Sequence, residues 1–294
     1  MKKFFLLFSI FLSLSFSAQQ DYDWFKINKY RVAVLNESIK ENSGLDFFND
    51  RVLTINDSGN SSEIFEINKE TGKIKNIFKT DLINNDWEAI TSDSTSLYIG
   101  DFGNNAGTRK DLTVYKIPFD SAVRASSSNN AQSIPFYYPE QKDFTPKNLN
   151  NDFDAEAMIF LNGKIHIFTK EWASKSTTHY VIDPLLTEKQ ATQKIEKQFT
   201  GFTVTDAAYF NQKLYLVGYT KKAEVFLTIF NESEPGIFFK EKPRKYYLGS
   251  SISIGQIEGI AVDKDGIYIS GEEFNLPILK VKPYLYFIPA EKLK

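Results

Sequence analysis

The chain has 294 residues, of which 42% are hydrophobic and 24% charged, a balance typical of a folded domain that excludes a disordered chain. It contains no cysteine, which excludes disulfides, thiol nucleophiles and cysteine-based zinc sites. The formal net charge is −2 and no basic run is present, so no nucleic acid is expected among the partners.

The first 18 residues, MKKFFLLFSIFLSLSFSA, predict a signal peptide. Two lysines precede an apolar run at residues 4–16, and small residues follow that run. The run is shorter than the ~20 residues that a membrane-spanning helix needs. We therefore expect cleavage near residues 17–20, a secreted or periplasmic protein without a membrane span, and one domain over residues 19–294.

The next candidate element is YRVAVLN at residues 30–36, a lone strand. Five later segments then share one pattern: an acid, one or two small or apolar residues, a short strand, a tight turn, and a second strand rich in Ile, Leu, Tyr and Val. They are GLDFFNDRVLTINDSGN (44–60), WEAITSDSTSLYIGDFGN (87–104), AEAMIFLNGKIHIFTKEW (155–172), TDAAYFNQKLYLVGYTK (205–221) and IEGIAVDKDGIYISGEE (257–273).

Further strand-like runs follow these hairpins, such as SEIFEIN and IKNIFKT after the first. Four strands per repeat are typical of a β-propeller. The sequence therefore predicts an all-β fold, a single β-propeller of five four-stranded blades with almost no helix. A sixth, degenerate blade between residues 88 and 156 is the alternative. The last hairpin lacks an obvious fourth strand, so we expect residues 30–36 to complete that blade and close the ring.

Aligned on their first strands, the repeats place a carboxylate at one position. These residues are Asp46, Glu88, Glu156, Asp206 and Glu258. The first strand of a propeller blade lines the central channel, so we expect a ring of five acids. Burial and like charges raise carboxylate pKa values, so either some of these acids are protonated or a cation lies among them. Oxygen ligands without cysteine favour calcium. In the alternative interpretation, each acid accepts hydrogen bonds from neighbouring backbone amides and holds adjacent blades together.

A second set of polar residues stands at the ends of the second strands, beside the starts of the first strands. These residues are Asp57, Asp101, Lys170 with Glu171, Tyr219, and Glu272 with Glu273. We expect a small-molecule or glycan ligand to contact this face through Asp101, Arg109, Lys170, Tyr219 and Glu272. Trp172 and Phe274 are available to stack on a sugar. The alternatives are loop organisation for Asp57 and Asp101 and a solvated loop position for Arg109. For Lys170 the alternative is a salt bridge with Glu156 or Glu171, and for the aromatic residues it is packing between blades.

These motifs resemble a group of exported bacterial β-propellers that share the stretches DWEDIA…LYVGDIGDN…R, AEAL…TKE and GEAI…E. More distantly, the chain is similar to the esterase-like phytase and SdiA-regulated propellers. The matching positions are Trp87, Glu88, Gly100, Asp101, Gly103, Asn104, Arg109, Glu156, Thr169, Lys170, Glu171, Asp206 and Glu258. The chain departs from the pattern at Ala89, where the group often has Asp, and at Asn105. The resemblance implies a propeller and export, and it supplies no reaction.

Two functions remain open. The first is a binding module that holds a cation in the carboxylate ring and a ligand on the same face. The second is a metal-dependent hydrolase of phosphoester, ester or lactone substrates, with Glu88 or Glu156 as general base. His166 and His179 are expected to be structural, and no G-x-S-x-G nucleophile elbow occurs. The oligomeric state is not indicated by any motif.

Overall fold

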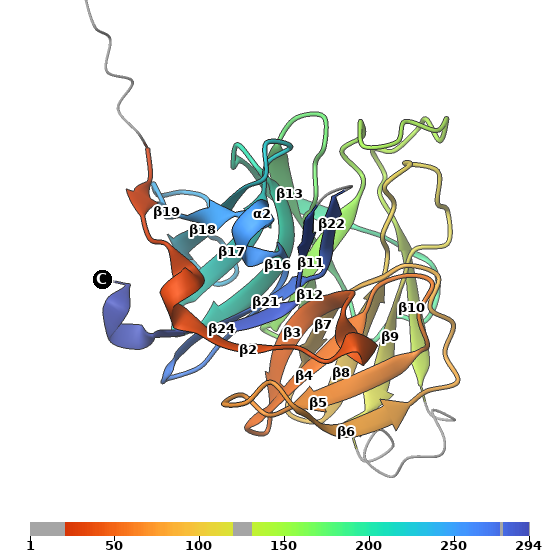
Figure 1. Ribbon diagram of the computed structural model, residues 1–294. Helices are drawn as coiled ribbons and strands as arrows, with labels where there is room; N and C mark the ends of the chain where they lie inside the picture. The colour runs from red at the N-terminus through yellow and green to blue at the C-terminus, as the bar shows by residue number, and fades with distance from the viewer. Residues whose placement is uncertain (1–20, 120–130, 277–278, 294) are drawn as a thin grey trace, which may run out of the picture.

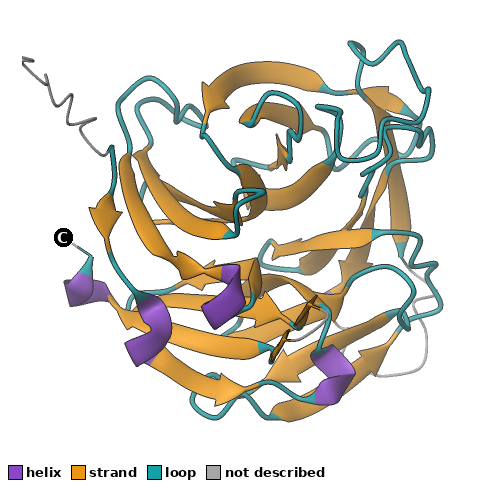
Figure 2. Cartoon of the chain, turned by 45° about the horizontal axis from the view of Figure 1, so that its top comes forward, coloured by secondary structure: helices purple, strands orange, loops and turns teal. Residues whose placement is uncertain are grey.

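The computed structural model describes residues 21–119, 131–276 and 279–293, and the predicted signal peptide at residues 1–18 lies outside this part. The described strands form five antiparallel sheets of four strands each, arranged as a five-bladed β-propeller (Figure 1). The prediction of five four-stranded blades is therefore confirmed. Figure 2 shows the blades around the axis, with only short helical turns between them.

Each blade begins at the axis, and the strands of blades 1 to 4 run outward in chain order, whereas the outer strand of blade 5 comes from the N-terminal part of the chain. Blade 1 is β3 (Asn42–Phe48), β4 (Arg51–Asn56), β5 (Glu63–Ile67) and β6 (Ile74–Lys79). Blade 2 is β7 (Trp87–Ser92), β8 (Ser96–Asp101), β9 (Thr113–Pro118) and β10 (Gln132–Tyr137). Blade 3 is β11 (Ala155–Leu161), β12 (Lys164–Thr169), β13 (Ser176–Ile182) and β15 (Gln193–Phe199). Blade 4 is β16 (Thr203–Phe210), β17 (Lys213–Tyr219), β18 (Glu224–Asn231) and β19 (Arg244–Ser250). Blade 5 is β20 (Gln256–Val262), β21 (Gly266–Glu272), β24 (Tyr284–Pro289) and β2 (Arg31–Val34).

Blade 5 confirms the predicted closure of the ring. Strand β2, from the N-terminal end of the described chain, pairs antiparallel with β24 from the C-terminal end. The segments on both sides of β2 are anchored in the core, because Ile27 and Ile39 are completely buried. The pairing covers the edge of β24, which would otherwise present unpaired backbone groups to solvent.

Tight turns at the predicted positions set the hairpins of blades 1, 3 and 4. The pairs Asn49–Asp50, Asn162–Gly163 and Asn211–Gln212 all have positive φ angles, between 47° and 75°. Two consecutive residues with positive φ make the turn whose twist matches that of the flanking strands, and Asn, Asp and Gly tolerate it best.

Several peripheral elements were not predicted. The fourth strand of blade 3, β15, was missed because its sequence QKIEKQF is largely polar and exposed. The two-residue strands β14 (Gln190–Ala191) and β1 (Asp23–Trp24) pair parallel with β10 and β19, and so extend the outer edges of blades 2 and 4. A small hairpin of β22 (Phe274–Leu276) and β23 (Leu279–Val281) is inserted in blade 5.

Short helical turns connect some of these strands. They are η1 (Ile27–Tyr30), η2 (Glu37–Ile39), α2 (Ser251–Ile254) and η3 (Ala290–Lys292). Among the described residues, no helix combines the length and the apolar character needed to cross a membrane.

The inner strands hold the propeller together around its axis. Each of β3, β7, β11, β16 and β20 contacts the inner strand of the blade on either side. Apolar side chains of adjacent blades share their cores, as Phe48 and Leu53 of blade 1 do with Trp87 and Ile90 of blade 2. The inner strands therefore face neighbours on both sides, and their starts converge at one end of the channel.

We predict that Ile27→Ala lowers the free energy of unfolding by about 2–5 kcal/mol, the range for truncating a buried isoleucine. Ile27 is fully buried and anchors the closing segment to the core. The matched control is Val34→Ala in β2, where the side chain is 49% exposed and a change below about 0.5 kcal/mol is expected. Urea denaturation followed by tryptophan fluorescence measures both, and equal effects would show that Ile27 does not anchor the closure.

Candidate functional site

A cavity of about 420 Å³ opens at the end of the channel where the inner strands begin; we call it the central pocket. Its lining includes five carboxylates: Asp57, Glu88, Glu156, Glu258 and Glu272. Lys170 is the one cationic side chain among the described lining residues. Ser43, Asn105, Asn148, Gln256 and Tyr219 add polar groups, and Leu149 and Trp172 add apolar surface. The pocket is therefore strongly acidic, with too few cations to neutralise it.

A β-bulge near the start of each inner strand decides which side chain reaches this pocket. In every blade the pairing of the first two strands skips one residue, and these residues are Gly44, Glu88, Glu156, Thr205 and Glu258. A bulged residue is left out of the ladder, and the strand bends there. The structurally equivalent ring therefore holds three carboxylates rather than the five predicted.

Asp46 and Asp206 correct the prediction of a five-acid ring. Asp46 lies two residues after the bulge of its strand and Asp206 lies one residue after it, and neither lines the central pocket. Asp206 Oδ2 accepts hydrogen bonds from the amides of Leu45 (3.1 Å) and Ile260 (2.7 Å), so this carboxylate joins the inner strands of three blades.

Asp46 links the first two blades in a similar way. Its Oδ2 accepts a hydrogen bond of 2.5 Å from the Ser92 hydroxyl on β7, and burial raises its pKa to about 7. For Asp46 and Asp206, the contacts match the alternative interpretation, in which the acids connect adjacent blades.

On one side of the central pocket a hydrogen-bonded network links Lys170 to three of the carboxylates, Glu156, Glu258 and Glu272. The Lys170 ammonium forms an ion pair with Glu156 Oε2 and donates to the Tyr219 hydroxyl at 3.3 Å. The Tyr219 hydroxyl donates to Glu258 Oε1 at 2.9 Å. Gln256 Nε2 then donates to both Glu258 and Glu272. Burial alone lowers the pKa of Lys170, but the attraction of Glu156 outweighs it and the pKa lies well above its usual range.

On the other side three acids gather, and no described residue forms an ion pair with them; we call them the acid cluster. Asp57 follows β4 of blade 1, Asp86 precedes β7 of blade 2, and Glu88 lies in β7. One carboxylate oxygen of each residue lies within 4.8 Å of the other two. Gly103 makes room for them, because a Cβ atom there would overlap Glu88 Oε1 and Asp86 Oδ2.

Glu88 is the least compensated member of the acid cluster. Its side chain is 4% exposed and lines the pocket, yet no hydrogen bond or ion pair from the described residues reaches its carboxylate. Burial, followed by repulsion from Glu156, Asp57 and Asp86, raises its pKa well above the ordinary value. Burial also raises the pKa of Asp57, to about 6.

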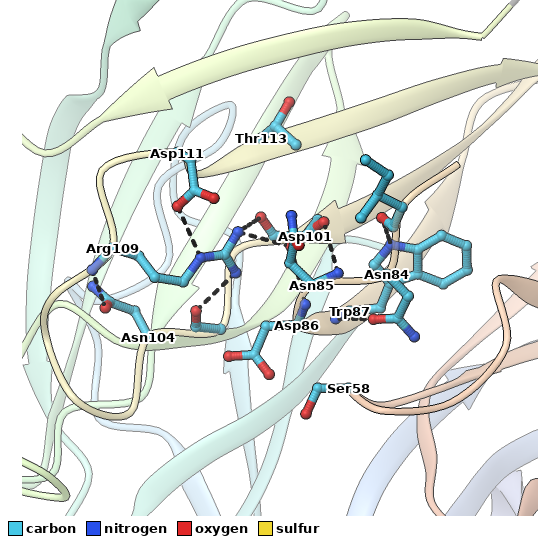
Figure 3. Close-up of polar contacts among 12 residues, drawn as sticks. Ser58, Asn84, Asn85, Asp86, Trp87, Asp101, Asn104, Arg109, Asp111 and Thr113 are labelled. Atoms are coloured by element: carbon cyan, nitrogen blue, oxygen red, sulfur yellow. Dashed lines mark hydrogen bonds and ion pairs between the residues drawn. The ribbon is translucent and has the colours of Figure 1, made fainter. Parts of the chain in front are cut away.

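Asp101 and Arg109 do not line the central pocket, contrary to the expectation that both contact a ligand there. Arg109 Nη2 forms an ion pair of 2.9 Å with Asp101, and its Nε forms one of 3.1 Å with Asp111 (Figure 3). Its Nη1 donates to the Gly103 carbonyl at 3.0 Å. Asp101 is completely buried and also accepts from the amides of Asn85 and Asp86. Both residues therefore shape the loop that carries Asp86.

The structure brings together most of the other predicted site residues. Glu88, Glu156, Glu258, Lys170, Tyr219 and Glu272 all line the central pocket, and Trp172 lies beside them. Asp86 was missed by sequence reasoning, although the acid immediately before Trp87 was a visible signal. His166 and His179 lie away from the pocket in blade 3, where their rings stack and His166 Nδ1 lies 2.8 Å from His179 Nε2.

Fold and pocket together define a five-bladed β-propeller with an acidic ligand-sized cavity at its axis. No protein-family model matches the chain, and a search of curated proteins finds no match. Hydrazine synthase from Kuenenia stuttgartiensis aligns with 87% of this chain and 68% of its own, at 9% identity and a TM-score of 0.43. The structure of YjhT aligns with 79% of this chain and 72% of its own, at 11% identity and a TM-score of 0.43. Similarities this low carry no information about activity.

We predict opposite effects of two matched substitutions on the chelator-treated protein at pH 8. Glu88→Gln removes an uncompensated buried charge and raises the free energy of unfolding by about 1–2 kcal/mol. Glu156→Gln leaves the buried Lys170 without its counter-ion, and it lowers the free energy of unfolding by roughly 2–4 kcal/mol. Urea denaturation of both variants and of the native protein measures the difference.

The gain from Glu88→Gln should depend on pH with a definite sign. The pKa of Glu88 is raised in the folded state, above the value of about 4.3 in an unfolded chain. The free energy of unfolding of the native protein therefore falls as the pH rises above that value, whereas Glu88→Gln has no carboxylate there and does not lose this stability. The gain is expected to disappear near pH 4. A destabilising effect of Glu88→Gln at pH 8 would show that the carboxylate is compensated.

Proposed function

We propose that the protein binds a divalent cation in the acid cluster, together with a small hydroxylated ligand in the central pocket. The observation that carries this proposal is Glu88, a buried carboxylate that lines the pocket without a partner from the described residues. Leaving such a charge uncompensated is costly. A cation beside Asp57, Asp86 and Glu88 would reduce that cost by bringing an opposite charge to the three carboxylates.

Calcium fits the donors of the acid cluster better than other common ions do. All three side chains offer carboxylate oxygens, and calcium accepts six to eight oxygen ligands in flexible geometry. Three protein carboxylates leave positions for water or for ligand hydroxyls. Magnesium requires a nearly ideal octahedron and gives up its water reluctantly, so we expect weaker binding.

Export also belongs to this proposal, and its support is the signal-like segment at residues 1–18. Calcium sites in extracellular modules commonly bind with dissociation constants of roughly 10⁻⁴–10⁻³ M, because the surrounding calcium concentration is high. A three-carboxylate site of moderate affinity suits that setting. The mass of the protein recovered outside the cytoplasm would show whether residues up to 17–20 have been removed.

We predict that calcium raises the melting temperature of the native protein relative to chelator, and that Glu88→Gln and Asp57→Asn abolish this shift. A ligand that binds only the folded state at 100 times its dissociation constant contributes about 2.7 kcal/mol. The shift is measured within each variant by differential scanning fluorimetry, so changes in the stability of the metal-free protein cancel.

Glu188→Gln, at an exposed acid outside the pocket, is the control and should keep the full shift. Magnesium at the same concentration should give a smaller shift. The cation proposal fails if millimolar calcium leaves the melting temperature of the native protein unchanged.

A metal-dependent hydrolase is the second candidate, because the positions that three carboxylates leave open on a cation would be available to a water or a substrate oxygen. Glu88 would then act as a ligand of the cation, or as the general base if Asp57 and Asp86 alone hold the cation. Glu156 fits that role less well, because Lys170 already engages its carboxylate. This candidate predicts calcium-dependent turnover of p-nitrophenyl phosphate, p-nitrophenyl acetate or a lactone, with at least about a hundredfold loss in Glu88→Gln. Calcium binding without any such turnover would exclude the hydrolase for these substrates and favour the binding module.

A further inference from the structure

A second cavity of about 280 Å³ adjoins the central pocket; we call it the side pocket. The two cavities have Trp172 and Tyr219 in common. The side pocket has the opposite charge, because Lys175, Lys221 and Lys222 line it with Glu224 as the single acid among its described lining residues. Glu224 is engaged by the Thr220 hydroxyl at 3.1 Å, and all three lysines are exposed.

Lys221 marks the boundary between the two cavities. Its ammonium donates to the backbone carbonyl of Leu149 at 3.0 Å and lies 5.6 Å from the centre of the Trp172 ring. Leu149 and Trp172 both line the central pocket. A positive charge is thus held at the rim of the acidic cavity, where an anionic group on a bound ligand would meet it.

Trp172 is held in place between the cavities. Its indole N–H donates to Asp154 at 3.0 Å and lies 3.2 Å from Asn105 Oδ1. The ring therefore has a fixed orientation, and its apolar surface contributes to both cavities. An aromatic ring fixed beside hydrogen-bonding groups is a suitable platform for the C–H groups of a sugar.

The opposite charges of the two cavities restrict the chemistry of a shared ligand. A polyanion would be repelled by the carboxylates of the central pocket, and an organic cation would be repelled by the side pocket. A neutral sugar would leave the lysines unused. A hydroxylated ring with one anionic substituent satisfies both cavities, because hydroxyls donate to carboxylates and coordinate a cation, while the anion pairs with lysine.

We propose that the ligand is a saccharide with a single anionic substituent. Its ring occupies the central pocket beside Trp172, and its carboxylate or phosphate lies against Lys221 and Lys222 in the side pocket. This inference rests on the proposed cation site, which supplies the positive charge that the hydroxyls approach.

The test is isothermal titration calorimetry on the calcium-saturated full chain with glucuronate, glucose 6-phosphate and glucose. At least one of the two acids is expected to bind at least tenfold more tightly than glucose. The double variant Lys221→Gln, Lys222→Gln should lose that tenfold preference while binding calcium as the native protein does. The control, Lys213→Gln with Lys292→Gln, changes the net charge equally and should bind the acids normally.

Each outcome has a distinct meaning. Binding of glucuronate alone, or of glucose 6-phosphate alone, identifies the anionic group. Equal binding of glucose and both acids, no binding of any of the three, or an unchanged preference in the Lys221, Lys222 variant would overturn the saccharide assignment while leaving calcium binding intact. Lysine-dependent binding of an acid without any calcium binding would instead keep the side-pocket assignment and overturn the cation site.

Discussion

Hydrogen bonds between neighbouring inner strands hold the axis of this propeller, and the central pocket depends on them. The Ser43 hydroxyl donates to the Glu88 carbonyl at 2.8 Å, and the Thr205 hydroxyl donates to the Ile257 carbonyl at 2.7 Å. Asp206 on β16 also accepts hydrogen bonds from backbone amides of β3 and β20. These contacts fix the backbone around the bulges, so acids with unfavourable mutual repulsion stay close together. A looser axis would let them separate into solvent.

The pocket has one side where Lys170 forms an ion pair and another side where the described residues form no ion pair with the acids. Lys170 pairs with Glu156 and, through Tyr219, connects to Glu258, so charge on that side is distributed over a network. Within the described part of the chain no cation forms an ion pair with the acid cluster, and the guanidinium of Arg109 pairs with Asp101 and Asp111 instead. The same chain therefore contains an internal comparison between a buried acid with a counter-ion and one without.

The sequence was sufficient to predict the fold, and it placed only part of the site. Turn residues such as Asn162 and Gly163 and the alternation of the strands are local properties, so five hairpins could be recognised. The spare strand at residues 30–36 was found because the last repeat lacked a partner for it. The positions of the bulges could not be predicted from the sequence, because a bulge is defined by how two strands pair. Each bulge shifts by one residue the side chain that faces the pocket. Asp46 and Asp206 therefore looked equivalent to Glu88 when they are not.

The composition of blade 5 has a consequence for the way the molecule is made. Three of its strands come from residues 256–289 and the fourth from residues 31–34. Strand β2 therefore cannot pair with β24 until almost the whole chain has been synthesised. Contacts this distant in sequence form slowly. A chain that ends before β24 cannot complete the ring, however many intact blades it contains. Its exposed strand edge would make it prone to aggregation or proteolysis.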